Sequence, residues 1–239
     1  MPVYDPRSAE VFDLLHRYRQ YDREADYVRS VVARECPQAR TLLDVACGTG
    51  GHLAPLVTHF DVQGLDLSPG MLARARAKFP QLRFHEASMC DFALGQRFDV
   101  ITCLFRSIAA MSTVDELQAA LRCMAAHLNP GGVLVLEPFF TPQTFWDGDV
   151  RTAQVEGEGV KVCWMYRSER RGRLGVFHNH YLIGRASGIE HVQEDYPLGL
   201  FEPPEMVAAF EAAGLAVRFD PQGLGPLGCY LGRAPGTMA

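Results

Sequence analysis

An apolar run that ends in a glycine-rich loop decides the architecture of this chain. Residues Thr41–Ala46 read as a buried strand, Gly48 and Gly50 follow it, and the segment Gly51–Phe60 has the spacing of a helix. Glycines at such a turn let the backbone approach a ligand closely, at the carboxyl edge of the first strand of an open α/β sheet. The pattern therefore predicts an α/β fold with a ligand site at this loop.

Strands and helices continue to alternate after this loop, which predicts a parallel sheet with helices on both faces. Ser68 and Thr113 are expected to cap helices, the latter in a capping box with Glu116. Two amphipathic helices are expected between Arg7 and Glu35, ahead of the sheet. The expected core elements are strands at Val62–Leu67, Leu82–His85, Phe98–Leu104 and Gly132–Leu136, and helices at Pro69–Phe79 and Thr113–His127.

Beyond Phe140 strands and helices no longer alternate. The segment Val155–Ile183 alternates around a polar turn at Glu169–Arg173, which predicts an antiparallel cover over the sheet edge. A helix at Pro204–Ala213 and strands at Ala216–Phe219 and Gly228–Leu231 are expected to complete a mostly parallel sheet of seven strands. The predicted regions are a helical lid at 1–38, a ligand-binding core at 39–140, the cover at 141–200, and closing elements at 201–239.

Composition excludes several classes of protein. The chain has 239 residues, 48% of them hydrophobic, and a net charge of -5, which fits one globular domain and disfavours nucleic-acid binding. Its seven cysteines show neither zinc nor redox-motif spacing, so we expect no metal and free thiols. No apolar run reaches the length of a signal peptide or membrane span, and we expect a cytoplasmic protein without membrane contact.

The loop composition narrows the choice of cofactor. No Gly-Lys-Ser/Thr follows the loop, so a P-loop is excluded. Asp44 lies in the strand beside the loop, where a pyrophosphate would meet a like charge. S-adenosylmethionine has no phosphate and carries a sulfonium and an ammonium, which an acid favours. Asp66, at the carboxyl end of the next strand, can accept both ribose hydroxyls, although helix capping alone is an alternative role for it.

The string LLDVACGTG and the elements around it resemble class I S-adenosylmethionine-dependent methyltransferases over residues 40–140. The resemblance implies a Rossmann-like core. Met89 would pack on the adenine, and Ser88 stands where an acid commonly binds the adenine amino group. Cys103 and Phe105 would line the methionine end. The predicted cofactor-binding residues are Tyr21, Asp44, Ala46, Cys47, Gly48, Gly50, Asp66, Leu67, Met71, Ser88, Met89, Cys103 and Phe105.

A closer likeness spans nearly the whole chain. The strings DFALGQRFDVITCLFRSI, GGVLVLEPFF and AAFEAAGL are similar to those of N,N-dimethyltransferases that act on nucleotide-linked 3-amino deoxysugars in macrolide pathways. That resemblance implies acceptor contacts from Tyr4 and from the segment containing Phe139 and Phe140. Two positions depart from the family pattern. Ala110 replaces a histidine or tyrosine, and Leu227 replaces an arginine that could contact phosphate.

Methyl transfer is an in-line displacement that depends mainly on positioning, so a strong base is not obligatory. Candidate catalytic groups are Tyr4, Glu137 and His180. His178 and His180 alternate on one expected strand and must share a face, which makes them jointly inward or jointly outward. The predicted acceptor contacts are Tyr4, Phe139, Phe140, His178, His191 and Glu194.

Several alternatives stay open at this point. The function expected is N-methylation of an amino sugar or related small amine. An O-methyltransferase of a natural product and a cofactor-binding protein without catalysis are the competing hypotheses. The basic run Arg167, Arg170, Arg171 and Arg173 could hold a substrate phosphate or be a solvated turn. A homodimer is also left open.

Overall fold

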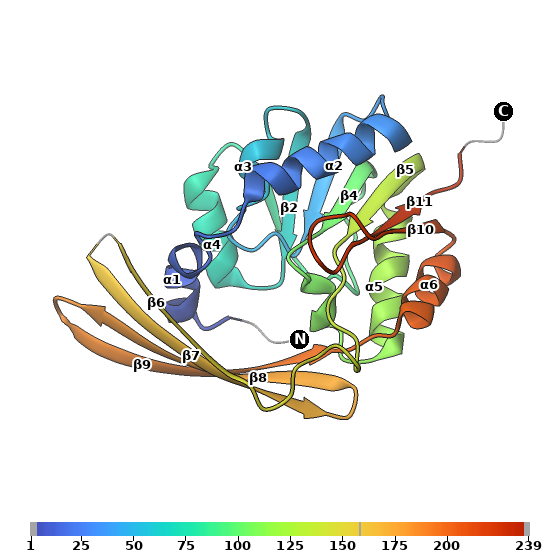
Figure 1. The fold of residues 1–239 in the computed structure, drawn as a ribbon. Helices are drawn as coiled ribbons and strands as arrows, with labels where there is room; N and C mark the ends of the chain where they lie inside the picture. The colour runs from blue at the N-terminus through green and yellow to red at the C-terminus, as the bar shows by residue number, and fades with distance from the viewer. Residues whose placement is uncertain (1–3, 158, 237–239) are drawn as a thin grey trace.

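The alternation of strands and helices produces the expected sheet. The computed structural model describes residues 4–157 and 159–236. Within them, a seven-stranded sheet has the order β10-β11-β5-β4-β1-β2-β3, and every strand except β11 runs in the same direction (Figure 1). Its strands are β1 (Thr41–Val45), β2 (Asp61–Asp66), β3 (Arg83–Glu86), β4 (Phe98–Cys103), β5 (Leu128–Leu136), β10 (Ala216–Asp220) and β11 (Cys229–Arg233).

Helices cover both faces of this sheet. Apolar side chains of α2 (Tyr21–Glu35), α3 (Leu53–Leu56) and α4 (Pro69–Lys78) pack on one face. Those of α5 (Val114–Ala126) and α6 (Pro203–Ala212) pack on the other. Ser68 and Thr113 are confirmed as cap residues, because Ser68 Oγ accepts from the Met71 N–H and Thr113 Oγ1 from the Glu116 N–H. The predicted capping box is not completed, because the Glu116 carboxylate accepts from the Ser112 N–H at 2.7 Å. No helix within the described ranges is long and apolar enough to cross a membrane.

One predicted helix is much shorter than expected. The segment predicted as helical over Gly51–Phe60 contains only the four-residue helix α3, with turns on either side. Gly51 belongs to the glycine loop. Pro55 has no N–H to donate to the carbonyl four residues earlier, so a regular helix cannot extend through the start of this segment.

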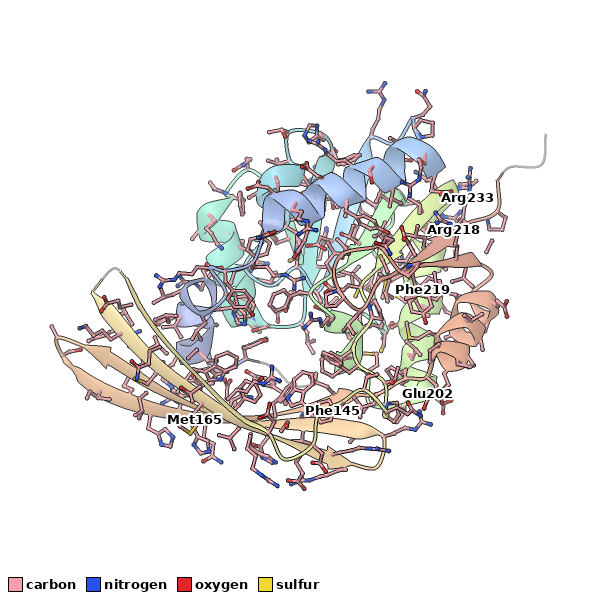
Figure 2. The ribbon with its side chains drawn as sticks, in the orientation of Figure 1. Phe145, Met165, Glu202, Arg218, Phe219 and Arg233 are labelled. Atoms are coloured by element: carbon pink, nitrogen blue, oxygen red, sulfur yellow. The ribbon has the colours of Figure 1, made fainter. Side chains whose placement is uncertain are left out.

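A second sheet forms the predicted antiparallel cover. Its strands are β6 (Val150–Gly157), β7 (Val160–Arg171), β8 (Leu174–Arg185) and β9 (Gly188–Gly199), in that order. The last strand, β9, was not predicted. The sheet lies across the carboxyl ends of the strands of the parallel sheet (Figure 1). Figure 2 shows Met165 on the outer side of this cover and Phe145 on the side toward the core.

The short helix α1 (Pro6–Leu15) joins the two sheets into one molecule. Val11 and Leu15 pack on the cover strands, whereas Ala9 and Phe12 contact Met71 of α4. The helix begins at Asp5, whose carboxylate accepts from the Arg7 N–H at 2.8 Å. Helix α1 therefore lies between the cover and the core.

Gly199, where β9 leaves the cover, is expected to tolerate no side chain. A Cβ there would overlap the Met111 carbonyl oxygen and lie 2.7 Å from the Phe201 ring. We expect Gly199→Ala to lower the free energy of unfolding by about 1–3 kcal/mol through overpacking. Urea unfolding measures this. Gly184→Ala is the matched control in β8, because its Cβ would meet nothing closer than 3.6 Å; equal stability of the two variants would contradict the prediction.

Candidate active site

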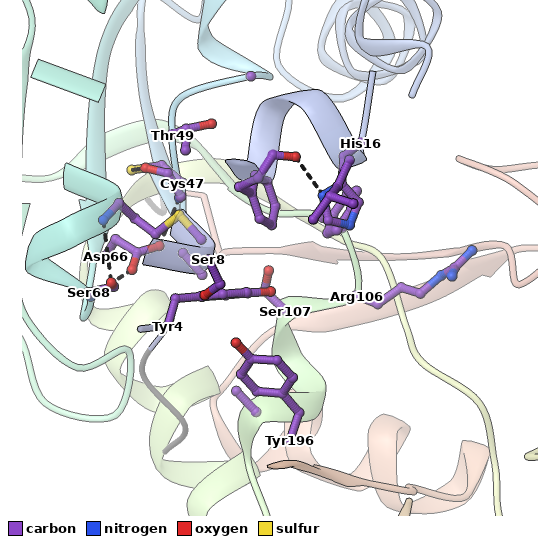
Figure 3. Close-up of a pocket in the computed structure, with 18 of the residues that line it drawn as sticks. Tyr4, Ser8, His16, Cys47, Thr49, Asp66, Ser68, Arg106, Ser107 and Tyr196 are labelled. Atoms are coloured by element: carbon purple, nitrogen blue, oxygen red, sulfur yellow. Dashed lines mark hydrogen bonds between the residues drawn. The ribbon is translucent and has the colours of Figure 1, made fainter. Parts of the chain in front are cut away.

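A cavity of about 350 Å³ lies where the lid, the carboxyl edge of the parallel sheet and the inner face of the cover meet. Residues from all three parts line it. Figure 3 shows Asp66 and Cys47 toward one side of this pocket, Arg106 on the opposite side, and Tyr4 and Tyr196 between them. The cavity therefore has two ends, which differ in chemistry.

Asp66 organises the first end. Its Oδ2 accepts from the Gly48 N–H and its Oδ1 from the Ser68 N–H, both at 2.8 Å. Burial raises the pKa of Asp66, whereas these backbone hydrogen bonds act to lower it. Each carboxylate oxygen can accept a further hydrogen bond. The group can therefore hold a vicinal diol such as the ribose of S-adenosylmethionine.

The glycine loop presents its backbone beside Asp66. Ala46 and Gly48 both have left-handed conformations, with φ of 60° and 54°. At Gly51 a Cβ would lie 2.5 Å from the ring of Tyr21, so the loop and the start of α2 are in direct contact. The structure places several residues that we expect at the cofactor in the lining of this cavity: Tyr21, Ala46, Cys47, Gly48, Leu67, Met71 and Met89.

Asp44 lies behind the loop and does not line the cavity. Its side chain is buried, and the Thr102 hydroxyl donates to Asp44 Oδ1 at 2.7 Å. Burial raises the pKa of Asp44 to about 6, although the neighbouring charge of His52 and the Thr102 hydrogen bond oppose this shift. Its side chain makes no direct contact with the cavity. The prediction that the cofactor rests against Asp44 needs this correction.

The other predicted cofactor residues divide into two groups. Phe105 lines the cavity. Gly50, Ser88 and Cys103 do not. Cys103 is fully buried under the sheet edge, and burial raises the pKa of its thiol. Ser88 Oγ accepts from the Cys90 N–H at 3.2 Å.

Tyr4 and Tyr196 stand near the middle of the cavity. Their ring centroids are 5.0 Å apart, and Tyr4 also packs edge-on against Phe12. Burial raises the pKa of both phenols, so both remain protonated at neutral pH. Glu194 does not line the cavity itself, but its Oε1 accepts from the Asp5 N–H and its Oε2 is buried without a hydrogen-bond partner among the described residues. The Tyr196 hydroxyl is likewise buried without a hydrogen bond of good geometry there, and its interaction with Glu194 adds to the rise in its pKa.

The cover contributes an aromatic wall. Its inward residues were missed in the sequence, although the alternation of β7 and β8 carries the signal: Trp164, Tyr166, Phe177, Asn179 and Tyr181 line the cavity. The intervening residues of β8 point outward. His178 and His180, which were predicted at the acceptor site, belong to this outward set.

His178, His180 and His191 are therefore not at the cavity. His178 lies on the outer face between Glu169 and Asp195, with nitrogen-to-oxygen distances of 3.0 and 2.9 Å. His180 Nδ1 lies 3.1 Å from His191 Nε2, and both residues are exposed. The two residues on β8 do share a face, as predicted, but it is the solvent face. We omit all three from the site.

The basic turn at Glu169–Arg173 also lies outside the cavity. Arg171 and Arg173 have about half of their side chains exposed, at 56% and 47%, and are paired with Glu169 and Glu205. The distances are 2.8 and 2.9 Å. Neither arginine lines the cavity, so the structure favours a solvated turn over a phosphate site.

Glu137 is not free to act as a base. Its side chain is 3% exposed, and Arg19 Nη2 donates to Glu137 Oε2 at 2.8 Å. Arg19 also pairs with Glu24, which in turn contacts His52 at 2.7 Å. These pairs join the lid to the end of β5. Of the two following aromatic residues, Phe139 lines the cavity and Phe140 does not.

His16, at the end of α1, lines the cavity and was also missed. Its Nδ1 donates to the Phe12 carbonyl at 2.9 Å, which leaves Nε2 as an acceptor in the neutral ring (Figure 3). Burial lowers the pKa of His16, so the ring is neutral at physiological pH. Within the described residues, no group of three or more His, Cys, Asp or Glu is arranged to hold a metal ion.

Comparisons with known proteins agree with this geometry. The family model described as "Methyltransferase domain" matches residues 42–132. The chain is 42% identical to a dTDP-3-amino-3,6-dideoxy-alpha-D-glucopyranose N,N-dimethyltransferase of Streptomyces fradiae, over 96% of this chain and 91% of that protein.

Solved structures extend the likeness to three dimensions. The crystal structure of Streptomyces venezuelae DesVI matches with a TM-score of 0.89 and 37% identity, covering 97% of this chain and all of that one. A structure of CalS10 with bound S-adenosylmethionine, an amino pentose methyltransferase of Micromonospora echinaspora, matches with a TM-score of 0.83 and 38% identity, covering 98% of both chains. The chain is therefore an S-adenosylmethionine-dependent methyltransferase and belongs to the family of nucleotide-linked amino-sugar N,N-dimethyltransferases.

Proposed function

We propose that this enzyme methylates the amino group of a nucleotide-linked amino deoxysugar, and does so twice. The full-length likeness to sugar N,N-dimethyltransferases supports the acceptor class. The observation that carries the proposal is a pair of buried oxygens without a hydrogen bond among the described residues, the Tyr196 hydroxyl in the cavity wall and Glu194 Oε2 behind it. Buried polar groups are normally hydrogen-bonded, so this pair suits the N–H groups of an amine.

The chain's own residues act mainly by positioning. Bound S-adenosylmethionine supplies a methyl group on a sulfonium. Asp66 would hold its ribose, and the buried charge of Asp44 favours a cation at this end. Tyr4 and Tyr196 would orient the amine so that its lone pair faces the methyl group, which is the arrangement an in-line displacement needs.

No strong base is required for this reaction. The amine attacks in its neutral form, and Glu194 would stabilise the positive charge that develops on the nitrogen. The ammonium formed by the first transfer must lose a proton before the second, and the neutral ring of His16 adds no opposing positive charge to the cavity. Its Nε2 can accept a hydrogen bond from the amine. Ala110 also lines the cavity but has no polar group to contribute.

Transfer to defined acceptors tests the proposal. We expect incubation with S-adenosylmethionine and dTDP-3-amino-3,6-dideoxyglucose to give a dimethylated product, detected by mass spectrometry as a gain of two methyl groups. The matching sugar with a hydroxyl in place of the amine is the control. Methylation of that hydroxyl would favour an O-methyltransferase, and tight cofactor binding without any transfer would favour a non-catalytic protein.

Asp66 is expected to contribute directly to cofactor affinity. Asp66→Ala removes a buried charged acceptor, and we expect S-adenosylmethionine to bind about 10- to 150-fold more weakly, equivalent to about 1.5–3 kcal/mol. Calorimetric titration measures the change. Asp61→Ala, at the exposed start of the same strand, is the matched control. Unchanged affinity in Asp66→Ala would remove this residue from the site.

Asp44 should make cofactor binding depend on pH. With a pKa near 6, Asp44 is about one-tenth ionised at pH 5 and nine-tenths ionised at pH 7. A cationic cofactor prefers the ionised form, so its affinity should rise with pH across this window, by up to about tenfold. Asp44→Asn should lose that part of the rise. Parallel pH curves for the two proteins would show that Asp44 has no electrostatic role.

Glu194 should affect turnover of the acceptor without changing the affinity for the cofactor. Glu194→Gln keeps the side-chain size but removes the charge, and we expect kcat/KM for the amino sugar to fall about 10- to 100-fold. The dissociation constant of S-adenosylmethionine should not change. Glu190→Gln is the control, since Glu190 is exposed on the same strand. A loss of cofactor affinity with normal acceptor kinetics would contradict this assignment.

A cytoplasmic location and a homodimer are also parts of the proposal. All seven cysteines are free thiols, which suits a reducing compartment. Met165 and Leu182 are about half exposed on the outer face of the cover, at 51% and 48%, and would be available to a second copy.

A further inference from the structure

Arg106 enters the cavity from a turn with unusual backbone geometry. Phe105 and Arg106 follow β4 with φ of 56° and 62°, in the left-handed region that residues with a side chain rarely adopt. Both residues line the cavity. Such conformations cluster at functional sites, where the surrounding structure holds them. The turn thus directs a cationic side chain to the end of the cavity opposite Asp66 (Figure 3).

The charge of Arg106 is only weakly compensated. Its Nε lies 3.4 Å from Glu137 Oε1, close enough for an ion pair, but this nitrogen is buried and makes no hydrogen bond among the described residues. Glu137 already binds Arg19 at 2.8 Å. Arg19 is 12% exposed and has a second carboxylate partner in Glu24. Arg106, with 32% of its side chain exposed, is therefore the arginine available to an anion in the cavity.

Aromatic rings surround the same end. The Arg106 guanidinium carbon lies 5.6 Å from the centre of the Phe140 ring, which packs edge-on against Trp146 at 4.4 Å. Trp146 and Phe139 line the cavity. The Trp146 Nε1 is buried without a hydrogen-bond partner among the described residues. A guanidinium, a free indole N–H and flat rings together suit a ligand with an anionic linker and a planar base.

We propose that Arg106 binds the diphosphate of the nucleotide-linked acceptor, with the nucleobase against the ring of Phe139 and beside the Trp146 indole N–H, since Arg151 and Phe145 already lie on the Trp146 ring. This inference rests on the proposed function. It orients the acceptor along the cavity, with the amine between Tyr4 and Tyr196 and the diphosphate toward Arg106. It also supplies a phosphate contact that the exposed Arg171 and Arg173 do not provide.

Nucleotide binding without methylation tests the inference. The full chain, saturated with S-adenosylhomocysteine, is titrated with thymidine 5′-diphosphate and with thymidine. We expect Arg106→Gln to weaken binding of the diphosphate at least tenfold, with thymidine and S-adenosylhomocysteine unchanged. Arg106→Lys keeps the charge without the planar fork and should give an intermediate affinity. If Arg106→Gln does not fold, the affinity of Arg106→Lys for thymidine 5′-diphosphate tests the inference instead.

Arg171→Gln, at an exposed arginine outside the cavity, is the matched control and should bind like the wild type. Equal affinity of wild type and both Arg106 variants for thymidine 5′-diphosphate would overturn the inference. The proposed function would then still stand if the wild type dimethylates the amino sugar. A wild type that binds the diphosphate no better than thymidine, and leaves the amino sugar unmethylated, would overturn both.

Discussion

A chain of buried charges joins the N-terminal helices to the parallel sheet at the wall of the cavity. Arg19, between α1 and α2, lies between the carboxylates of Glu24 and Glu137, and Glu24 also binds His52 beside the glycine loop. Removing one member would leave a buried charge uncompensated, which typically costs about 3–5 kcal/mol. The same pairs occupy Glu137 and so leave Arg106 partly free. Lid position, glycine loop and cavity charge are thus coupled through one set of contacts.

The cofactor half of the molecule could be predicted from sequence because its geometry is local. A strand, a glycine turn and an acid at the end of the next strand fix their own relative positions in a parallel sheet. Gly48 and Asp66 are 18 residues apart and meet through one hydrogen bond. Asp44 was placed on the correct strand, but the sequence could not show that its side chain points behind the loop.

The acceptor half was less predictable, because it depends on contacts between distant segments. Alternation along β8 indicates two faces but not which one is covered, and His178 was chosen where Asn179 faces the cavity. Arg19 and Glu137 are 118 residues apart, and no local pattern joins them. Tyr4 was predicted through family resemblance alone. Its partner Tyr196 lies on β9, a strand that the sequence pattern did not reveal.

The two sheets share no strand pairing within the described parts of the chain. In the proposed arrangement the methyl donor binds at the parallel sheet, whereas the wall that would face the acceptor comes mainly from the cover and α1. Side chains such as Trp164 and Phe177 can therefore be exchanged without disturbing a hydrogen bond that orders the glycine loop. Substitutions in this one wall could therefore change which sugar the enzyme accepts, while the residues that bind the methyl donor stay unchanged.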